Sequence, residues 1–173
     1  MLTIESEPWF ALQVTPRHEK RVETILQHKN YGHFLPMCRT RRNWSDRIKT
    51  IEQPLFPGYV FVRCPLSSVG KVRGTPGIIR IVSFGGKPCP VPDAQIRALQ
   101  RVIDSNRGLT SFPYLAAGQK VQIVAGPLSG ITGIIIQLKN RHRLIVAVDL
   151  IMRSVSVEID ELEAEPLALP RPA

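Results

Sequence analysis

The stretch Pro54-Leu55-Phe56-Pro57-Gly58-Tyr59-Val60-Phe61-Val62 decides the fold of the N-terminal part of this chain. Side chains of a strand alternate between the two faces of a sheet, so Tyr59 and Phe61 are expected on one face and Val60 and Val62 on the other. Pro57-Gly58 predicts a tight turn that brings Phe56 beside the two aromatics. The stretch therefore predicts a central strand whose aromatic face either packs as core or stays exposed and binds a partner.

Strand and helix patterns alternate around this central strand as far as residue 106. Strands are expected at residues 9–14, 31–37, 55–63 and 78–83. Helices are expected at 17–29, with Thr15 as cap and Pro16 as opening residue, at 69–73, and from Pro92-Asp93 to 103. This order predicts an α+β sandwich, with helices on one side of a small sheet.

The pattern changes after Asn106-Arg107-Gly108, where helical periodicity ends. Short runs rich in Val and Ile recur at residues 120–124, 133–137, 144–149 and 155–159, separated by turn residues. Such runs predict a small closed all-β barrel. We therefore expect a first domain at 1–106, a linker at 107–116, a barrel domain at 117–165 and a loose tail at 166–173.

The positive charge of the chain is unevenly distributed. Residues 1–110 carry 17 basic and 8 acidic residues and so account for the whole formal net charge of +9. Residues 111–173 carry 6 basic and 6 acidic residues and have no net charge. Segregated positive charge is typical of a nucleic-acid-binding surface. A basic surface without any partner remains the alternative.

Several classes of protein are disfavoured by the sequence. No apolar run approaches the roughly 20 residues that span a bilayer, and residues 1–7 lack the features of a signal peptide. The cysteines, Cys38, Cys64 and Cys89, are odd in number and widely spaced, which favours reduced thiols in the cytoplasm over disulfides or zinc. The histidines and carboxylates form no catalytic or metal-binding pattern, so we expect neither an enzyme nor a cofactor.

Two motifs resemble those of a known family. The stretch 54–62 resembles the signature of the NusG family of transcription elongation factors, and Gly118 to Gly130, followed by Gly133-Ile134-Ile135, resembles a KOW motif. Trp9-Phe10, residues 75–78 and Phe84-Gly85-Gly86 follow the order of that family as well. The resemblance covers roughly residues 8–165. It implies an NGN-like α+β domain joined to a KOW barrel, and a factor that binds RNA polymerase across its cleft and suppresses pausing or termination.

The resemblance also implies which residues bind the polymerase. An exposed aromatic patch grips the clamp helices, and a second loop reaches the other side of the cleft. On this chain the corresponding residues are Phe56, Pro57, Tyr59, Phe61, Trp9, Ser67 and Ser68. For Trp9, a role as a core residue of the first strand is the favoured alternative.

Basic residues on two segments form a candidate nucleic-acid-binding surface. They are suited to follow the phosphates of the non-template DNA strand. A solvated helix face, balanced by Glu19 and Glu23, is the alternative. The predicted residues are Arg17, Lys20, Arg21, His28, Lys29, Lys71, Arg73 and Thr75.

The stretch Arg39 to Lys49 is a second basic candidate. It carries Arg41, Arg42 and Arg47 with Trp44 between them, and it is expected to be a hairpin or loop. Basic residues next to an aromatic suit nucleic acid, whereas a mobile charged loop is the competing interpretation.

The barrel departs from the pattern of the housekeeping members of the family. Leu128 follows Gly126-Pro127 where those members have phenylalanine, and Ile151-Met152-Arg153 replaces Phe-Gly-Arg. These departures favour a specialised paralogue similar to RfaH or UpxY. The predicted partner-binding residues of the barrel are Gly126, Pro127, Leu128, Ile131, Leu150 and Ile151. Ribosomal protein S10 is one candidate partner, and the departures disfavour Rho first and S10 second.

Two other classes of function fit the sequence less well. A ribosome-associated KOW protein that binds RNA is expected to carry a basic barrel, but residues 111–173 have no net charge. An enzyme is disfavoured because the sequence shows no catalytic constellation.

The resemblance to specialised paralogues such as RfaH raises a second possible fold for the barrel domain, a helical hairpin. The barrel is favoured for the free protein, because Gly126, Pro127 and Gly130 disfavour a helix, whereas Ile134-Ile135-Ile136 favours a strand.

Overall fold

The computed structural model describes residues 7–115 and 118–167. The chain divides into two compact units, Met1–Ile96 and Arg97–Ala173, and each is treated by itself. The first is mixed α and β and the second is built mainly from strands, so the expected order of an α+β domain followed by an all-β domain is confirmed.

The main sheet of the first unit has the order β2-β5-β1-β6, with β9 pairing at the β6 side of β1. The central pair, β1 and β5, is antiparallel, and Ala11 lies opposite Phe61. The elements of the unit are β1 (Trp9–Val14), α1 (Glu19–His28), β2 (Gly32–Phe34), β3 (Met37–Asn43), β4 (Ile48–Pro54), β5 (Tyr59–Arg63), η2 (Leu66–Ser68), α2 (Val69–Arg73), β6 (Ile78–Ile81), β7 (Ser83–Phe84), β8 (Lys87–Pro88), β9 (Pro90–Val91) and the start of α3 (Asp93–Asp104).

The alternation of β5 is as predicted. Val60 and Val62 belong to one buried cluster that also holds Phe10, Leu12 and Val14 of β1, together with apolar residues of α1 and α2. Phe61 is buried outside that cluster. The valine face of the sheet is therefore the one covered by α1 and α2, and the aromatic residues lie on the opposite face.

Helix α1 begins later than the sequence predicted. Its N-cap is His18, because Arg17 adopts a left-handed conformation with φ of 68° and interrupts any helix that would start at Pro16. Lys29 is the C-cap, so the predicted end is confirmed to within one residue. The prediction of Thr15 as cap and Pro16 as opening residue was wrong.

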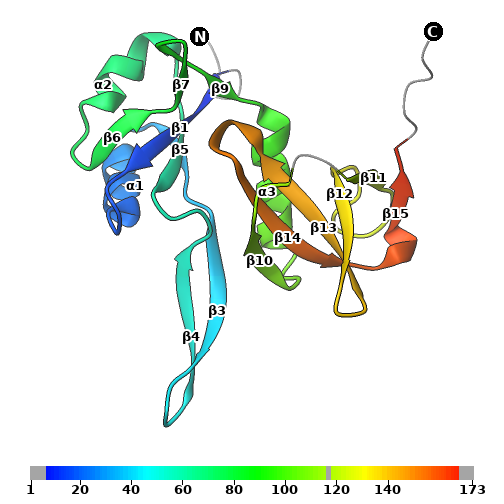
Figure 1. The fold of residues 1–173 in the computed structure, drawn as a ribbon. Coiled ribbons are helices and arrows are strands. Elements are labelled where there is room, and N and C mark those ends of the chain that lie inside the picture. The colour runs from blue at the N-terminus through cyan, green and yellow to red at the C-terminus, as the bar shows by residue number, and fades with distance from the viewer. Residues whose placement is uncertain (1–6, 116–117, 168–173) are drawn as a thin grey trace, which may run out of the picture. The chain divides into compact units, whose positions relative to one another are not determined.

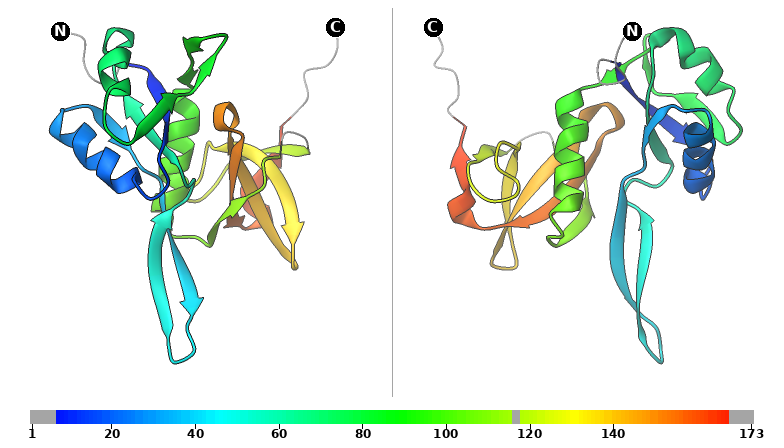
Figure 2. Two further views of the ribbon diagram at one scale, coloured as in Figure 1. Left: turned by 60° about the vertical axis from the view of Figure 1, so that its left-hand side comes forward. Right: turned by 180° about the vertical axis from the view of Figure 1, so that it is seen from behind.

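Strands β3 and β4 form a two-stranded sheet of their own, which we call the arm. Seven residues of one strand pair with seven of the other, from Met37 opposite Pro54 to Asn43 opposite Ile48. The arm extends from the rest of its unit as a long ribbon (Figures 1 and 2). Of the two predicted possibilities, hairpin or loop, the structure shows the hairpin.

The second unit holds a six-stranded antiparallel sheet in the order β10-β14-β13-β12-β11-β15. The end of α3 from Arg97 onward also belongs to this unit. The strands and short helices are β10 (Leu109–Phe112), β11 (Gln119–Ile123), β12 (Thr132–Leu138), β13 (Arg141–Val148), η3 (Asp149–Ile151), β14 (Arg153–Ile159), η4 (Glu161–Glu163) and β15 (Ala164–Pro166).

Four of these strands match the predicted runs, but β10 and β15 do not. Residues 107–116 were expected to be a linker, yet β10 pairs with β14 from Leu109 opposite Val157 to Phe112 opposite Ser154. At the other end, β15 pairs with β11. Thr110 and Ser111 interrupt any apolar run, so the segment is recognised as a strand only from its pairing with β14, in which Thr110 lies opposite Ser156.

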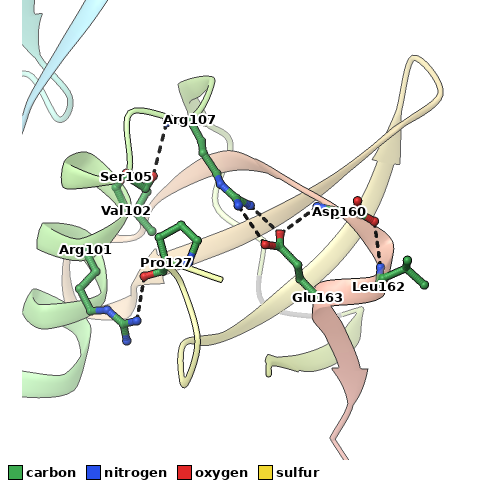
Figure 3. Close-up of polar contacts among 8 residues, drawn as sticks. All are labelled: Arg101, Val102, Ser105, Arg107, Pro127, Asp160, Leu162 and Glu163. Carbon is green, nitrogen blue, oxygen red and sulfur yellow. Dashed lines mark hydrogen bonds and ion pairs between the residues drawn. The ribbon is translucent and has the colours of Figure 1, made fainter. Parts of the chain in front are cut away.

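An ion pair connects the chain before β10 to η4. Arg107 donates from Nη1 and Nη2 to both carboxylate oxygens of Glu163, at 2.5 and 2.9 Å. The same carboxylate accepts from the Asp160 N–H at 3.1 Å, and Asp160 Oδ1 accepts from the Leu162 N–H, which completes a capping box (Figure 3). The Arg107 hydrogen bonds, followed by the Asp160 N–H, lower the pKa of Glu163.

Candidate functional site

The turn before β5 has the conformation that its residues predicted. Tyr59 N–H donates to Phe56 C=O at 3.1 Å, and Gly58 has φ of 84°. Proline at the second position and a glycine with positive φ at the third define a type II turn. The turn therefore sets the direction in which Phe56 and Tyr59 leave the backbone.

Two hydrogen bonds hold this turn against the rest of the unit. Val14 N–H donates to Gly58 C=O at 2.8 Å, and Gly58 N–H donates to Glu19 Oε1 at 2.9 Å. Glu19 is only 5% exposed, although the sequence suggested that it balances charge on the helix surface. Sequence reasoning missed this role, because a glutamate in the first turn of a helix is ordinarily explained by the helix dipole.

The predicted aromatic patch is mostly buried. Phe56 is 1% exposed and Phe61 is 0% exposed, whereas Tyr59 is half-buried. Phe61 packs against Phe34 of the neighbouring β2, with the ring centroids 6.1 Å apart and the planes at 25°. The expectation of three exposed aromatic rings was therefore wrong, because the rings of Phe56 and Phe61 are used for packing within the protein.

The other residues expected at this surface differ in exposure. Trp9 is buried, and the guanidinium of Arg63 lies 5.3 Å from its ring centroid, in a cation–π contact. Pro57 and Ser67 are exposed, and Ser68 is half-buried at the end of η2. Of the seven predicted residues, those that reach solvent are Pro57, Tyr59, Ser67 and Ser68.

The predicted basic residues of the first unit lie on its surface. Arg17, Lys20, Arg21, His28, Lys29, Lys71 and Arg73 are all exposed. Thr75 is 2% exposed, and its Oγ1 accepts a hydrogen bond from Lys29 Nζ at 3.0 Å. Thr15 N–H, just before α1, donates to Gly77 C=O at 2.8 Å. The turn after α2 is therefore bonded to the segment that precedes α1 as well as to Lys29 at the end of α1. Thr75 thus positions Lys29 and does not itself present a surface.

The predicted partner-binding residues of the second unit are divided between surface and core. Gly126 and Pro127 are exposed, and Gly126 takes φ of 76°. Leu128, Ile131 and Ile151 are 0%, 4% and 5% exposed. Leu150 is half-buried. The expectation that all six form a binding surface was therefore wrong, because the leucine after Gly126-Pro127 turns inward and joins the apolar core.

The turn at Pro127 is bound by the end of α3. Arg101 Nη2 donates to Pro127 C=O at 2.9 Å (Figure 3). The turn itself is closed by Ser129 N–H to Gly126 C=O at 3.2 Å and by Gly130 N–H to Ile123 C=O at 2.7 Å. It is a structured turn, ordered by its own backbone and by a neighbouring helix.

Met152 occupies a backbone position that favours glycine. It caps η3 with φ of 49° and ψ of 50°, and its side chain is 59% exposed. The housekeeping pattern places glycine here, and the structure supplies the reason, since glycine adopts this left-handed conformation at no steric cost.

The cysteines of the chain are free thiols in the structure. Cys38 and Cys64 are buried and Cys89 is half-buried. Burial, with a smaller contribution from the charge of Glu7, raises the pKa of the Cys64 thiol to about 11. Within residues 7–115 and 118–167, no group of three or more His, Cys, Asp and Glu side chains is arranged to hold a metal ion. Across the same residues, the helices are too short or too polar to span a membrane.

Comparison with known proteins shows which family has this architecture. The family model described as transcription termination factor nusG matches residues 7–100. The transcription termination/antitermination protein NusG of Thermus thermophilus is 27% identical over 157 residues, which cover 82% of this chain and 84% of that protein. The protein of the same name from Lactococcus lactis is 26% identical and covers 91% of each.

A solved structure supports the fold over nearly the whole length. The structure described as domain interaction in Thermotoga maritima NusG has a TM-score of 0.56 and 24% identity, and it covers 95% of this chain and 99% of that one. The family model spans more than half of the chain and includes the Pro54–Val62 stretch and the turn at Gly58. It also includes the exposed residues Lys20, Arg21 and Lys29 of α1 and its C-cap, which we call the basic α1 surface. This chain therefore belongs to the NusG family.

Proposed function

We propose that this protein is a transcription elongation factor that binds RNA polymerase and suppresses pausing or termination. As a member of the NusG family, it is a NusG-like transcription factor, and the family is not enzymatic. The observation that carries the finer proposal is the structured turn at Gly58, which holds Tyr59 at the edge of an otherwise buried aromatic face.

The proposed polymerase-binding surface combines a supported aromatic ring with nearby exposed residues. Tyr59 and Pro57 supply the contact, and Phe56 and Phe61 support it from within the unit. Tyrosine is well suited to this role, since its ring offers apolar area and its hydroxyl a polar end. On this proposal the clamp helices of the polymerase bind at Tyr59, and η2, with Ser67 and Ser68, reaches the other side of the cleft.

Binding should be tested with the full chain and core RNA polymerase. Tyr59→Ala is expected to weaken binding by about 1–3 kcal/mol if Tyr59 is an anchor of the interface, while Tyr59→Phe retains most of the affinity. Phe84→Ala is the matched control, because Phe84 is an aromatic residue of the same unit and is 83% exposed. Equal affinity of all three variants, with unchanged circular dichroism, would reject Tyr59 as a contact.

The basic α1 surface is proposed to contact the non-template DNA strand. Lys20 and Arg21 are exposed on α1 and Lys29 is exposed at its C-cap, where its Nζ donates to Thr75 Oγ1 in the turn after α2. Each lost phosphate contact is expected to reduce the slope of log affinity against log salt by about 0.7 for single-stranded DNA. The affinity for a DNA scaffold with an open bubble is measured over a series of salt concentrations. If none of the three substitutions changes the slope, these residues form a solvated face and do not contact phosphates.

The second unit is proposed to recruit a partner, with ribosomal protein S10 as the candidate and without stimulation of Rho. The phenylalanine that follows Gly-Pro in housekeeping members is replaced here by Leu128, which is buried, so only Gly126 and Pro127 of this turn are exposed partner-binding candidates. In-vitro transcription with Rho is the test, and enhanced Rho-dependent termination would contradict the proposal.

A further inference from the structure

The distal half of the arm is exposed on both strands and at its turn. All residues from 41 to 50 are exposed. The tip is closed by two backbone hydrogen bonds, Trp44 N–H to Arg47 C=O at 2.8 Å and Arg47 N–H to Trp44 C=O at 3.3 Å. Seven residues per strand at about 3.3 Å each give a ribbon roughly 20 Å long. The tip is thus held well away from the sheet of its unit, as the views in Figure 2 show.

The charges of the arm are balanced at its base and unbalanced near its tip. At the base, Arg39 Nε lies 3.2 Å from Glu52 Oε1 on the opposite strand. Toward the tip, Arg41 lies opposite Thr50, two residues beyond Arg39, and Arg42 lies directly opposite Lys49, three residues beyond it. Like charges at directly opposite positions of two strands destabilise the pairing. Stability of the hairpin therefore does not explain this arrangement, whereas a polyanionic ligand does.

The tip combines this charge with exposed apolar side chains. Residues 41–50 contain four basic residues and one acidic residue, Asp46, so they supply a net +3 of the whole chain's +9. Trp44 is 59% exposed and Ile48 is 69% exposed. An exposed indole on a hairpin rich in cationic residues is the combination that stacks on an unpaired base while the cations contact the flanking phosphates.

We propose that the arm tip is a binding site for single-stranded nucleic acid, separate from the basic α1 surface. Trp44 stacks on an unpaired base, and Arg41, Arg42, Arg47 and Lys49 contact the phosphates. A duplex is a poorer fit, because its bases are already stacked on one another and offer no free face to the indole ring. Ribose and deoxyribose strands share the recognised chemistry, so the experiment has to distinguish them.

The test uses the full-length protein without polymerase, so its result is independent of the proposed polymerase binding. Fluorescence anisotropy is measured with a labelled 12-nucleotide DNA, the RNA of the same sequence, and the corresponding DNA duplex. Trp44→Ala is expected to lower affinity for a single strand about 10-fold, and Trp44→Phe to retain most of it. Replacing Arg42 and Lys49 by glutamine together is expected to reduce the salt slope by about 1.4. The stronger of the DNA and RNA responses identifies the natural ligand.

Two controls separate this site from others. Lys20→Gln with Arg21→Gln alters the α1 surface and is expected to leave the 10-fold effect of Trp44→Ala intact. In a Trp9→Phe background, Trp44 is the remaining tryptophan of the sequence, so stacking should quench the fluorescence when a single strand binds. The proposal is overturned if Trp44→Ala binds every probe within twofold of the unchanged protein, if quenching is absent at saturation, or if Trp44 contributes only to duplex binding.

Discussion

Replacing Glu19 by alanine is expected to destabilise the first unit by about 2–3 kcal/mol. The carboxylate is 5% exposed and accepts a hydrogen bond from Gly58 N–H at 2.9 Å. A hydrogen bond to a charged group contributes about 1.5–3 kcal/mol, and its removal leaves a partly buried N–H without its acceptor. A negative charge in the first turn of α1 adds about 0.5 kcal/mol through the helix dipole.

Urea unfolding followed by tryptophan fluorescence measures this loss. Trp9 is 7% exposed and is the internal reporter, so the experiment is performed in a Trp44→Phe background that removes the signal of the exposed arm. With a slope of about 1.5 kcal/mol per molar urea for a unit of this size, the midpoint is expected to fall by roughly 1.5 M. Glu19→Gln keeps an acceptor oxygen and should lose less than half as much.

Glu23→Ala is the matched control, because Glu23 lies one turn further along α1 and is half-buried. Its expected effect is about 0.5 kcal/mol or less, as is usual for substitutions near a surface. If Glu19→Ala and Glu23→Ala have equal midpoints, the carboxylate of Glu19 does not hold the turn at Gly58, and the structural reasoning is refuted. A larger loss for Glu19→Ala accompanied by weaker polymerase binding would connect the turn to the proposed surface.

Two further predictions concern the second unit. Met152→Gly should raise the stability of this unit by about 0.5–1 kcal/mol, because relief of the strain of the left-handed conformation (φ 49°) exceeds the entropy that glycine adds to the unfolded chain. Thermal unfolding should show no such gain for Met152→Ala, and equal melting temperatures of the two variants would contradict the explanation. The lowered pKa of Glu163 means that its ion pair with Arg107 contributes stability above the unfolded pKa, near 4.5, and that this stability is lost as the pH falls through the folded value. Urea titrations followed by the NMR signals of Val121 and Ile123 between about pH 3 and pH 7 should therefore show a pH dependence that Glu163→Gln reduces, and a dependence unchanged in that variant would exclude Glu163 as its source.

Local rules of backbone geometry made several features predictable from the sequence alone. Pro57-Gly58 gave a type II turn because proline presets one dihedral angle and glycine tolerates the positive φ of the next. The alternation of Tyr59-Val60-Phe61-Val62 assigned the two faces of β5 correctly, since the period of a strand is fixed. Helix α2 lies at the predicted residues 69–73.

Features that depend on distant residues were decided only by the tertiary structure. The sequence could not reveal that Glu19 turns inward to Gly58, because its partner is 39 residues away. It did not show β10, whose polar residues become a strand only beside β14. It also overestimated the exposure of Phe61 and Leu128. Residue type and spacing determine which face a side chain occupies, but what covers that face depends on packing between segments far apart in the chain, which no local pattern encodes.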